Sequence, residues 1–197
     1  MNKLVKITAI ACTATIGFIA CNKGDDHMAV PALSDESAVQ VEAKIDVPAG
    51  QKVFFDFNTN AQADSAKSMV NLSGMYGSTL KNSQETVYKM GYFDMQNTSV
   101  SALTVQQVLG ANITLTNTFS IDATSAGAPA GSTPFWIVYD FANNHAVYPT
   151  ANRYIVWYKG ENLSAASDEL FIAQAKRVTA ARGNASYEID VKKITKK

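Results

Sequence analysis

The chain has 197 residues, in which 17 Lys and Arg side chains balance 17 Asp and Glu side chains, so the formal net charge at pH 7 is zero. Apart from the lysines among its last six residues, the sequence contains no basic cluster. This composition argues against nucleic acid as a partner, because proteins that bind it gather Lys and Arg on one face.

The first twenty residues have the parts of a bacterial secretory signal in the required order. A short basic region with two lysines comes first, and an apolar run over residues 7–20 follows. This run is too short to cross a bilayer as a helix, which takes about 20 apolar residues. Because small Ala20 stands directly before Cys21, we expect residues 1–20 to be a lipoprotein signal peptide and Cys21 to carry the lipid. The alternative is an ordinary signal peptide followed by a chance cysteine.

Acyl chains on Cys21 would anchor the mature protein in membrane lipid. The short stretch of Lys23, Asp25 and Asp26 resembles a surface-export signal of Gram-negative lipoproteins, which favours the outer membrane and the cell surface. The alternative is a solvated tether that faces the periplasm. We expect residues 21–36 to be the acylated N-terminus and a flexible linker, and residues 37–197 to be one folded domain.

The first half of the domain has mainly the two-residue period of strands. Apolar and polar side chains alternate cleanly over residues 39–47, and a second strand over residues 53–57 follows the turn Pro48-Ala49-Gly50. These two strands are predicted to pair as a hairpin. Residues 85–95 are expected to form a strand broken at Gly91, whereas residues 69–80 show no clear period.

The second half continues this pattern with a single short helix. Residues 102–109 favour that helix, capped by Ser99 or Ser101 and stopped by Gly110. The predicted strands cover residues 113–121, 135–141, 154–158, 170–178 and 187–194. A long loop is expected at 123–133, with tight turns at 143–144 and 182–184. The sum is a mainly β chain, a single sandwich or barrel-like domain with at most one or two short helices.

The sequence offers no recognisable catalytic motif. His27 falls in the expected tether, so His145 is the only histidine expected in the domain. There is no Gly-x-Ser-x-Gly nucleophile elbow and no pair of cysteines with zinc-ligand spacing. We therefore expect a protein that is not an enzyme.

Aromatic and methionine side chains are dense in the middle of the domain. The aromatic clusters lie within residues 88–93 and 135–158, and four methionines fall near the first cluster: Met69, Met75, Met90 and Met95. One interpretation is ordinary β-core packing. The other is a flat apolar pocket with sulfur or imidazole above an iron, as haem sites require.

Residues 135–159 contain a Trp-Tyr strand, a turn with His, then Pro, Arg and an aromatic-aliphatic strand. The residues at these places are Trp136, Tyr139, His145, Pro149, Arg153 and Tyr154. This segment resembles the HmuY-like family of lipid-anchored haem-binding proteins, and the lipoprotein start agrees with that family. The resemblance implies a mostly β fold that grips haem between loops through two axial His or Met side chains. It also implies delivery of haem to a TonB-dependent receptor in the outer membrane.

The same resemblance assigns candidate residues. His145, Met90 and Met95 are the candidate axial ligands, with Met75 and Met69 also open, since the domain is expected to hold no second histidine. The candidate haem-pocket residues are Trp136, Tyr139, Tyr148 and Arg153. No metal other than haem iron is expected.

Two other functions remain open at the level of sequence. A non-catalytic surface adhesin or glycan-binding module could stack Trp136 or Trp157 on sugar rings. A structural surface protein would instead pair with its partners by strand addition.

Replacing Cys21 with Ser tests the predicted anchor. The variant should incorporate no labelled palmitate and should leave the membrane fraction, because the acceptor thiol is gone. The matched control is Cys12→Ser, which lies in the segment expected to be discarded and should keep both properties. Palmitate on the Cys21→Ser protein would contradict the assignment.

Overall fold

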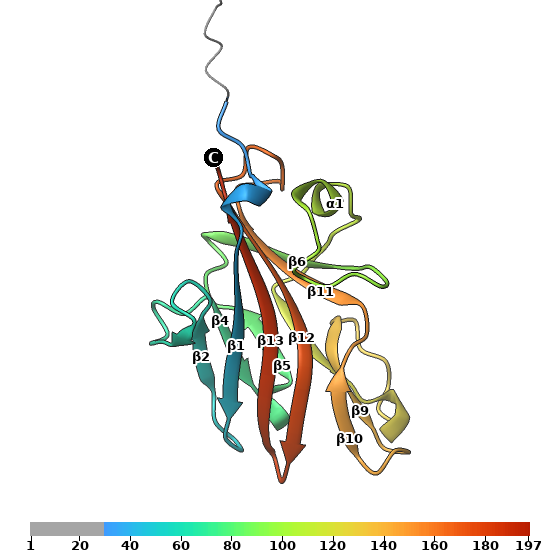
Figure 1. Cartoon of the computed structure of the whole chain (residues 1–197). Coiled ribbons are helices and arrows are strands. Elements are labelled where there is room, and N and C mark those ends of the chain that lie inside the picture. The colour runs from blue at the N-terminus through green and yellow to red at the C-terminus, as the bar shows by residue number, and fades with distance from the viewer. Residues whose placement is uncertain (1–29) are drawn as a thin grey trace, which may run out of the picture. The chain divides into compact units, whose positions relative to one another are not determined.

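The computed structural model describes residues 30–197, in which two curled, mainly antiparallel sheets pack face to face (Figure 1). The predicted signal peptide, Cys21 and His27 lie outside the described residues. The prediction of a mainly β sandwich or barrel-like domain is confirmed.

The first sheet has six strands in the spatial order β1 (Val39–Val47), β13 (Asn184–Thr195), β12 (Glu169–Ala181), β11 (Arg153–Lys159), β6 (Tyr88–Asp94) and β7 (Thr114–Leu115). The second sheet has seven, in the order β10 (Ala146–Pro149), β9 (Phe135–Asp140), β8 (Thr118–Asp122), β5 (Thr79–Asn82), β4 (Val70–Ser73), β2 (Val53–Asp56) and β3 (Ala61–Gln62). The β8–β9 pair is parallel. The short helices are η1 (Asp35–Ser37), η2 (Met75–Gly77), α1 (Val105–Leu109) and η3 (Thr124–Ala126).

Strand periodicity sorts the apolar side chains into two buried clusters. On β11, Ile155 and Trp157 belong to the large cluster that also holds residues of the seven-stranded sheet. Tyr154, Val156 and Tyr158 point to the opposite face and join the smaller cluster, which includes side chains of α1. The six-stranded sheet is therefore covered on both faces here, which explains why β11 is apolar throughout.

The predicted hairpin of the first two strands is wrong. β1 pairs along its whole length with β13, from Val39 opposite Lys193 to Val47 opposite Ala185. β2 belongs to the other sheet, between β3 and β4. The turn after β1 therefore carries the chain from one sheet to the other, and the apolar faces of the two strands meet within the core.

Two predicted strand boundaries also differ from the structure. β6 runs unbroken through Gly91, where a Cβ would lie 2.7 Å from Ile113 Cγ2 and 2.8 Å from the Thr114 carbonyl oxygen. Glycine is needed there for the close approach of the neighbouring strand. Residues 113–121 form two strands, because the chain turns after Leu115 and crosses from β7 in one sheet to β8 in the other.

The helix and the last hairpin follow their local signals. Thr104 caps α1 in a capping box with Gln107, so the predicted serine caps are wrong, although Gly110 does end the helix. The β12–β13 hairpin turns through Arg182 and Gly183, both with positive φ, as a two-residue turn requires.

The segment that precedes β1 is part of the folded domain. Leu33 is buried, and its backbone N–H donates to the Ala165 carbonyl oxygen at 2.8 Å. The Asp35 carboxylate accepts from the Val105 backbone N–H at 3.1 Å, and the Ser37 hydroxyl donates to the Thr195 carbonyl oxygen at 2.7 Å. Packing thus begins before residue 37, so that residues 33–36 do not behave as linker.

A cluster of charged side chains closes one end of the large core. The buried Glu169 carboxylate accepts hydrogen bonds from Tyr88 at 2.5 Å, Lys193 at 2.6 Å and Lys159 at 2.9 Å. Burial alone would raise the pKa of Glu169, but the hydrogen bonds from Lys193, Tyr88 and Lys159 outweigh it and hold this pKa below its usual value. The carboxylate thereby ties β6, β11 and β13 to β12.

Glu169→Gln should destabilise the domain at neutral pH by about 2 kcal/mol, less than a fully buried pair costs, because both lysines keep some contact with solvent. Since the pKa of Glu169 is lower in the folded state, its stabilising contribution is present above the unfolded-state pKa of about 4.3 and is lost as pH falls through the folded value. Urea denaturation of both proteins between pH 3 and 7 measures this difference.

The expected difference in the free energy of unfolding between wild type and Glu169→Gln becomes smaller as the pH falls towards 3. Asp168→Asn is the matched control, because the neighbouring carboxylate is exposed and paired with Lys196 alone, and it should change the midpoint little. An equal loss of stability in both variants, or a loss of stability in Glu169→Gln that does not depend on pH, would contradict the role given to Glu169.

Candidate functional site

His145 lies at the tip of the β9–β10 hairpin, at the edge of the seven-stranded sheet. Asn144 and His145 both have positive φ, 51° and 58°, and the Ala146 N–H donates to the Asn143 carbonyl oxygen, so the tight turn lies one residue later than the expected Asn143-Asn144. Because the turn occupies a sheet edge, the imidazole is exposed to solvent. The structure therefore presents the one histidine of the described residues at an accessible place.

The imidazole is held by aromatic neighbours from the same hairpin. The Tyr139 hydroxyl is 2.5 Å from His145 Nδ1, and the Phe141 ring meets the imidazole edge-on with centroids 4.8 Å apart. This contact engages Nδ1 and leaves Nε2 as the nitrogen for a ligand. When Nε2 of a histidine binds a metal, the proton sits on Nδ1 and is donated to a neighbouring acceptor, a role that the Tyr139 oxygen can take.

Tyr148 lies on β10, the other strand of this hairpin. Its ring is 40% exposed, and its hydroxyl donates to Asp140 Oδ2 at 3.3 Å. Partial desolvation and the charges of Asp140 and Asp122 raise the pKa of Tyr148, so the phenol stays protonated at neutral pH. Phe141 is 55% exposed. Phe141 and His145 are both exposed and in contact with each other, and with the adjoining Tyr139 ring they form an accessible aromatic patch, which we call the hairpin patch. Tyr148 pairs with Val138, so it lies on the strand face opposite Tyr139 and outside this patch.

The predicted methionine ligands lie elsewhere. Met90 is 1% exposed, on the core face of β6 directly opposite Trp157, because the two-residue period of the strand turns it inward. Met95 is half-buried against the smaller core cluster. Met69 is fully buried, whereas Met75, in η2, is 54% exposed. Among these four, only Met75 offers its sulfur freely to a ligand.

Trp136, a predicted pocket residue, belongs to the core. It is 2% exposed, its indole N–H donates to the Ser78 carbonyl oxygen at 2.8 Å, and its ring stacks on Tyr187 with centroids 4.8 Å apart. Trp157 is fully buried as well. Neither tryptophan can stack on a sugar, so the prediction that Trp136 or Trp157 contacts a glycan is wrong.

Arg153, the other predicted pocket residue on β11, ties the two sheets together. Its guanidinium makes a two-point pair with Asp94 at 2.8 and 2.9 Å and donates to the Phe135 carbonyl oxygen on β9 at 2.6 Å. The same group lies over the Tyr92 ring at 4.4 Å and the Phe135 ring at 5.0 Å. These contacts occupy most of its donors and give it a structural role.

Arg153→Ala should destabilise the domain by about 2 kcal/mol, because it leaves the Phe135 carbonyl and Asp94 without their charged donor. Arg177→Ala removes an exposed arginine paired with Glu188 and should cost less than about 1 kcal/mol. Urea denaturation checks both values. Similarly small losses of stability in the two variants would show that Arg153 does not hold the two sheets together.

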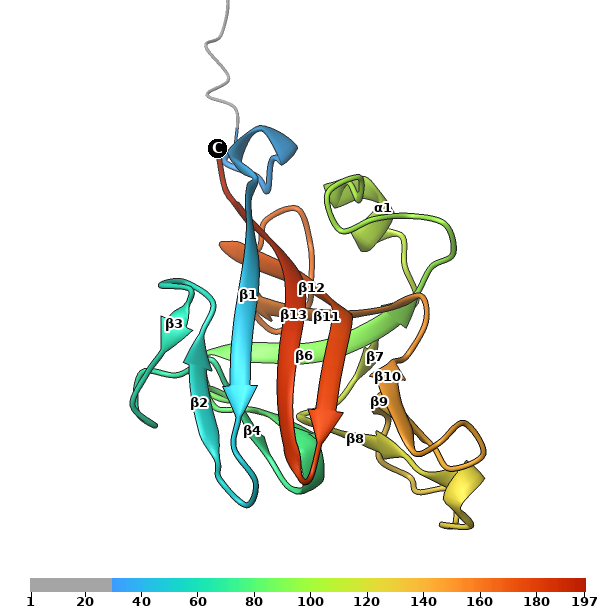
Figure 2. The same cartoon turned by 60° about the horizontal axis from the view of Figure 1, so that its bottom comes forward.

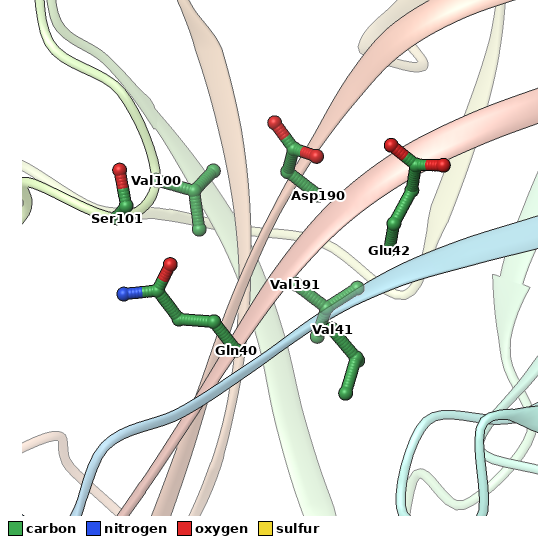
Figure 3. A pocket seen from close by; sticks show the side chains of 7 residues that line it. All are labelled: Gln40, Val41, Glu42, Val100, Ser101, Asp190 and Val191. Atoms are coloured by element: carbon green, nitrogen blue, oxygen red, sulfur yellow. The ribbon is translucent and has the colours of Figure 1, made fainter.

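The surface is also hollowed on the outer side of β1 and β13 (Figure 3). This hollow, of about 270 Å³, is lined by Gln40, Glu42, Ser101 and Asp190 above three valines. The two carboxylates share Lys176, at 3.4 and 3.8 Å. The lining includes none of the residues singled out from the sequence. A hollow of about 400 Å³ lies beside Arg153, between β7 and residues 131–135.

Sequence reasoning found His145, Tyr139 and Tyr148 but missed Phe141, Asp140 and the exposure of Met75. Large residues on both faces of 135–141 were the available signal for Phe141, since both faces of this segment cannot be buried in one core. Within residues 30–197 no group of three or more His, Cys, Asp or Glu side chains is placed to hold a metal ion. No helix in this range is long and apolar enough to cross a membrane.

No protein-family model, curated protein or solved structure matches this chain. The hairpin patch is therefore interpreted from its own geometry and from the sequence resemblance over residues 135–159.

Proposed function

We propose that this protein is a non-catalytic, lipid-anchored carrier that binds haem at the hairpin patch, with His145 Nε2 as an axial ligand of the iron. The observation that carries the proposal is an exposed imidazole whose Nδ1 is engaged by Tyr139. Phe141 adds exposed aromatic surface beside it. A planar porphyrin gains from such rings through apolar burial and stacking.

The second axial ligand in this proposal is Met75. Its loop lies against the hairpin, since Tyr76, its neighbour in sequence, stacks on Tyr139 with centroids 6.4 Å apart. Thioether sulfur is an established haem ligand. Met90 is 1% exposed in the core and Met95 is half-buried against the smaller cluster, so the proposal prefers the exposed Met75 to either of them.

The geometry suits a carrier that passes its cargo on. The hairpin patch is an open surface, so a receptor could reach the haem without a domain having to unfold. In Figures 1 and 2 the β9–β10 hairpin and η1 lie at opposite ends of the folded unit that begins at residue 31. The patch therefore lies at the end of this unit away from η1, which directly follows the first residues of the unit. A TonB-dependent receptor of the outer membrane is the proposed acceptor.

A second candidate function uses the opposite face of the same hairpin for glycans. Tyr148 is 40% exposed there, and the Asp140 carboxylate beside it is a hydrogen-bond acceptor. Exposed rings next to a carboxylate can stack on sugar faces and accept from their hydroxyls. This candidate needs neither His145 nor Met75, and the two proposals therefore respond to different variants.

Haemin titration of the purified protein, from residue 22 onwards, tests the first proposal. We expect a Soret shift in the wild type, at least about tenfold weaker binding in His145→Ala through loss of the iron ligand, and a changed ligand-field spectrum in Met75→Leu. Phe141→Ala should weaken binding less. The absorbance and the magnetic circular dichroism of the same samples report affinity and ligation.

Met95→Leu and His27→Ala are the matched controls, because the proposal gives neither side chain a role, and both should bind as the wild type does. An unshifted wild-type spectrum would exclude haem. Binding on a glycan array that is lost in Tyr148→Ala and retained in His145→Ala would support the second candidate in its place.

A further inference from the structure

The loop of residues 74–78 has an unusual backbone. Gly74, Tyr76 and Gly77 all have positive φ, at 78°, 60° and 66°. For Gly77 this conformation is free of strain, and its missing Cβ also makes room for Val47, which would lie 2.9 Å away. For Tyr76 it is costly, because a bulky side chain with positive φ crowds its own backbone. A glycine would fit this position without strain, so the Tyr76 side chain must have a use.

Two buried aromatic side chains hold this loop in place. The Tyr187 hydroxyl donates to the Tyr76 carbonyl oxygen, and the Trp136 indole N–H donates to the Ser78 carbonyl oxygen at 2.8 Å. The two rings stack on each other in the core with centroids 4.8 Å apart. Burial raises the pKa of Tyr187, which keeps its hydroxyl protonated as a donor. The strained Tyr76 backbone is thus held by two side chains that are themselves fixed by their packing in the core.

These two hydrogen bonds to the loop place the Tyr76 ring against Tyr139. The Tyr76 ring stacks on the Tyr139 ring at an interplanar angle of 24°, and the Tyr139 hydroxyl contacts His145 Nδ1 at 2.5 Å. Tyr139 lies near the end of an edge hairpin and is only half-buried, so the stack on Tyr76 is one of the contacts that orient its ring. A continuous set of contacts therefore runs from the core at Tyr187 to the exposed imidazole.

We propose that Tyr187 and Tyr76 are positioning residues for His145, which fix its imidazole through the Tyr139 ring before any ligand arrives. The effect of this positioning on haem affinity rests on the haem site proposed above. The ordering of the imidazole itself does not, because it is a property of the ligand-free protein. Backbone strain retained at a clamped loop is often associated with pre-organised binding sites. Preorganisation of the imidazole increases affinity because less side-chain freedom is lost on binding.

The test uses the ligand-free protein first. In NMR spectra the wild type should show contacts between the Tyr76 and Tyr139 rings and a single ordered imidazole for His145. Tyr187→Phe, which removes only the hydroxyl, and Tyr76→Ala, which removes the stack, should both broaden or average the His145 ring signals. Tyr76→Phe keeps the ring and should leave them unchanged. Unchanged His145 signals in a folded Tyr187→Phe protein would overturn the inference.

Haemin affinity then separates positioning from general stability. Tyr187→Phe should weaken haemin binding roughly tenfold, as losses of groups that orient a metal ligand do. In a His145→Ala background the same change should have no further effect, because the side chain that it positions is absent. An equal loss in both backgrounds would overturn the inference. If the wild type binds no haemin, the proposed function fails, and the NMR comparison alone decides the positioning role.

Discussion

The stack of Trp136 on Tyr187 is the contact on which much of this domain depends. Trp136 comes from β9 in the seven-stranded sheet and Tyr187 from β13 in the six-stranded sheet, so the pair joins the two layers at the core. Each ring also uses its polar atom to hold a carbonyl of the loop at residues 74–78. Buried aromatic residues with satisfied polar atoms combine apolar burial with a fixed geometry. The same pair thereby packs the sandwich and shapes the loop beside the candidate site.

Polar ties reinforce the sandwich away from this stack. Glu169 gathers Tyr88, Lys159 and Lys193 at one end, and Arg153 links β11 to Asp94 and to the backbone of β9. Both groups are paired on several sides, which is the condition under which a buried charge is tolerated. Arg153, predicted from the sequence to line a binding pocket, serves the scaffold instead. The segment of residues 135–159 holds the candidate ligand and the side chains that fix its surroundings.

The proposed site differs from an enclosed pocket. His145 and Phe141 lie on an edge hairpin and remain open to solvent, and Met75 is exposed on the loop whose Tyr76 ring stacks on Tyr139. An open site favours exchange of cargo over long retention, since dissociation needs no opening of the fold. In this arrangement the exposed ligand depends for its orientation on groups in the core, so the function proposed for the surface and the packing of the interior are linked.

The sequence by itself determined the features that depend on neighbours along the chain. Alternation over residues 39–47 fixed a one-faced strand, Gly110 fixed the end of the helix, and Arg182-Gly183 fixed the last hairpin, because local backbone preferences decide such features. His145 was found for a similarly simple reason, as the one histidine beyond the expected linker, in a segment marked by two asparagines.

Only the tertiary structure decided which strands pair and which side chains stay accessible. β1 and β2 occupy different sheets because the core is better covered by stacking their apolar faces than by pairing their edges. Trp136 and Met90 looked like site residues in sequence, yet burial removed both, while Met75 was left exposed. Strand period tells which residues share a face, but which face turns inward depends on the packing of distant segments, and a single strand does not contain that information.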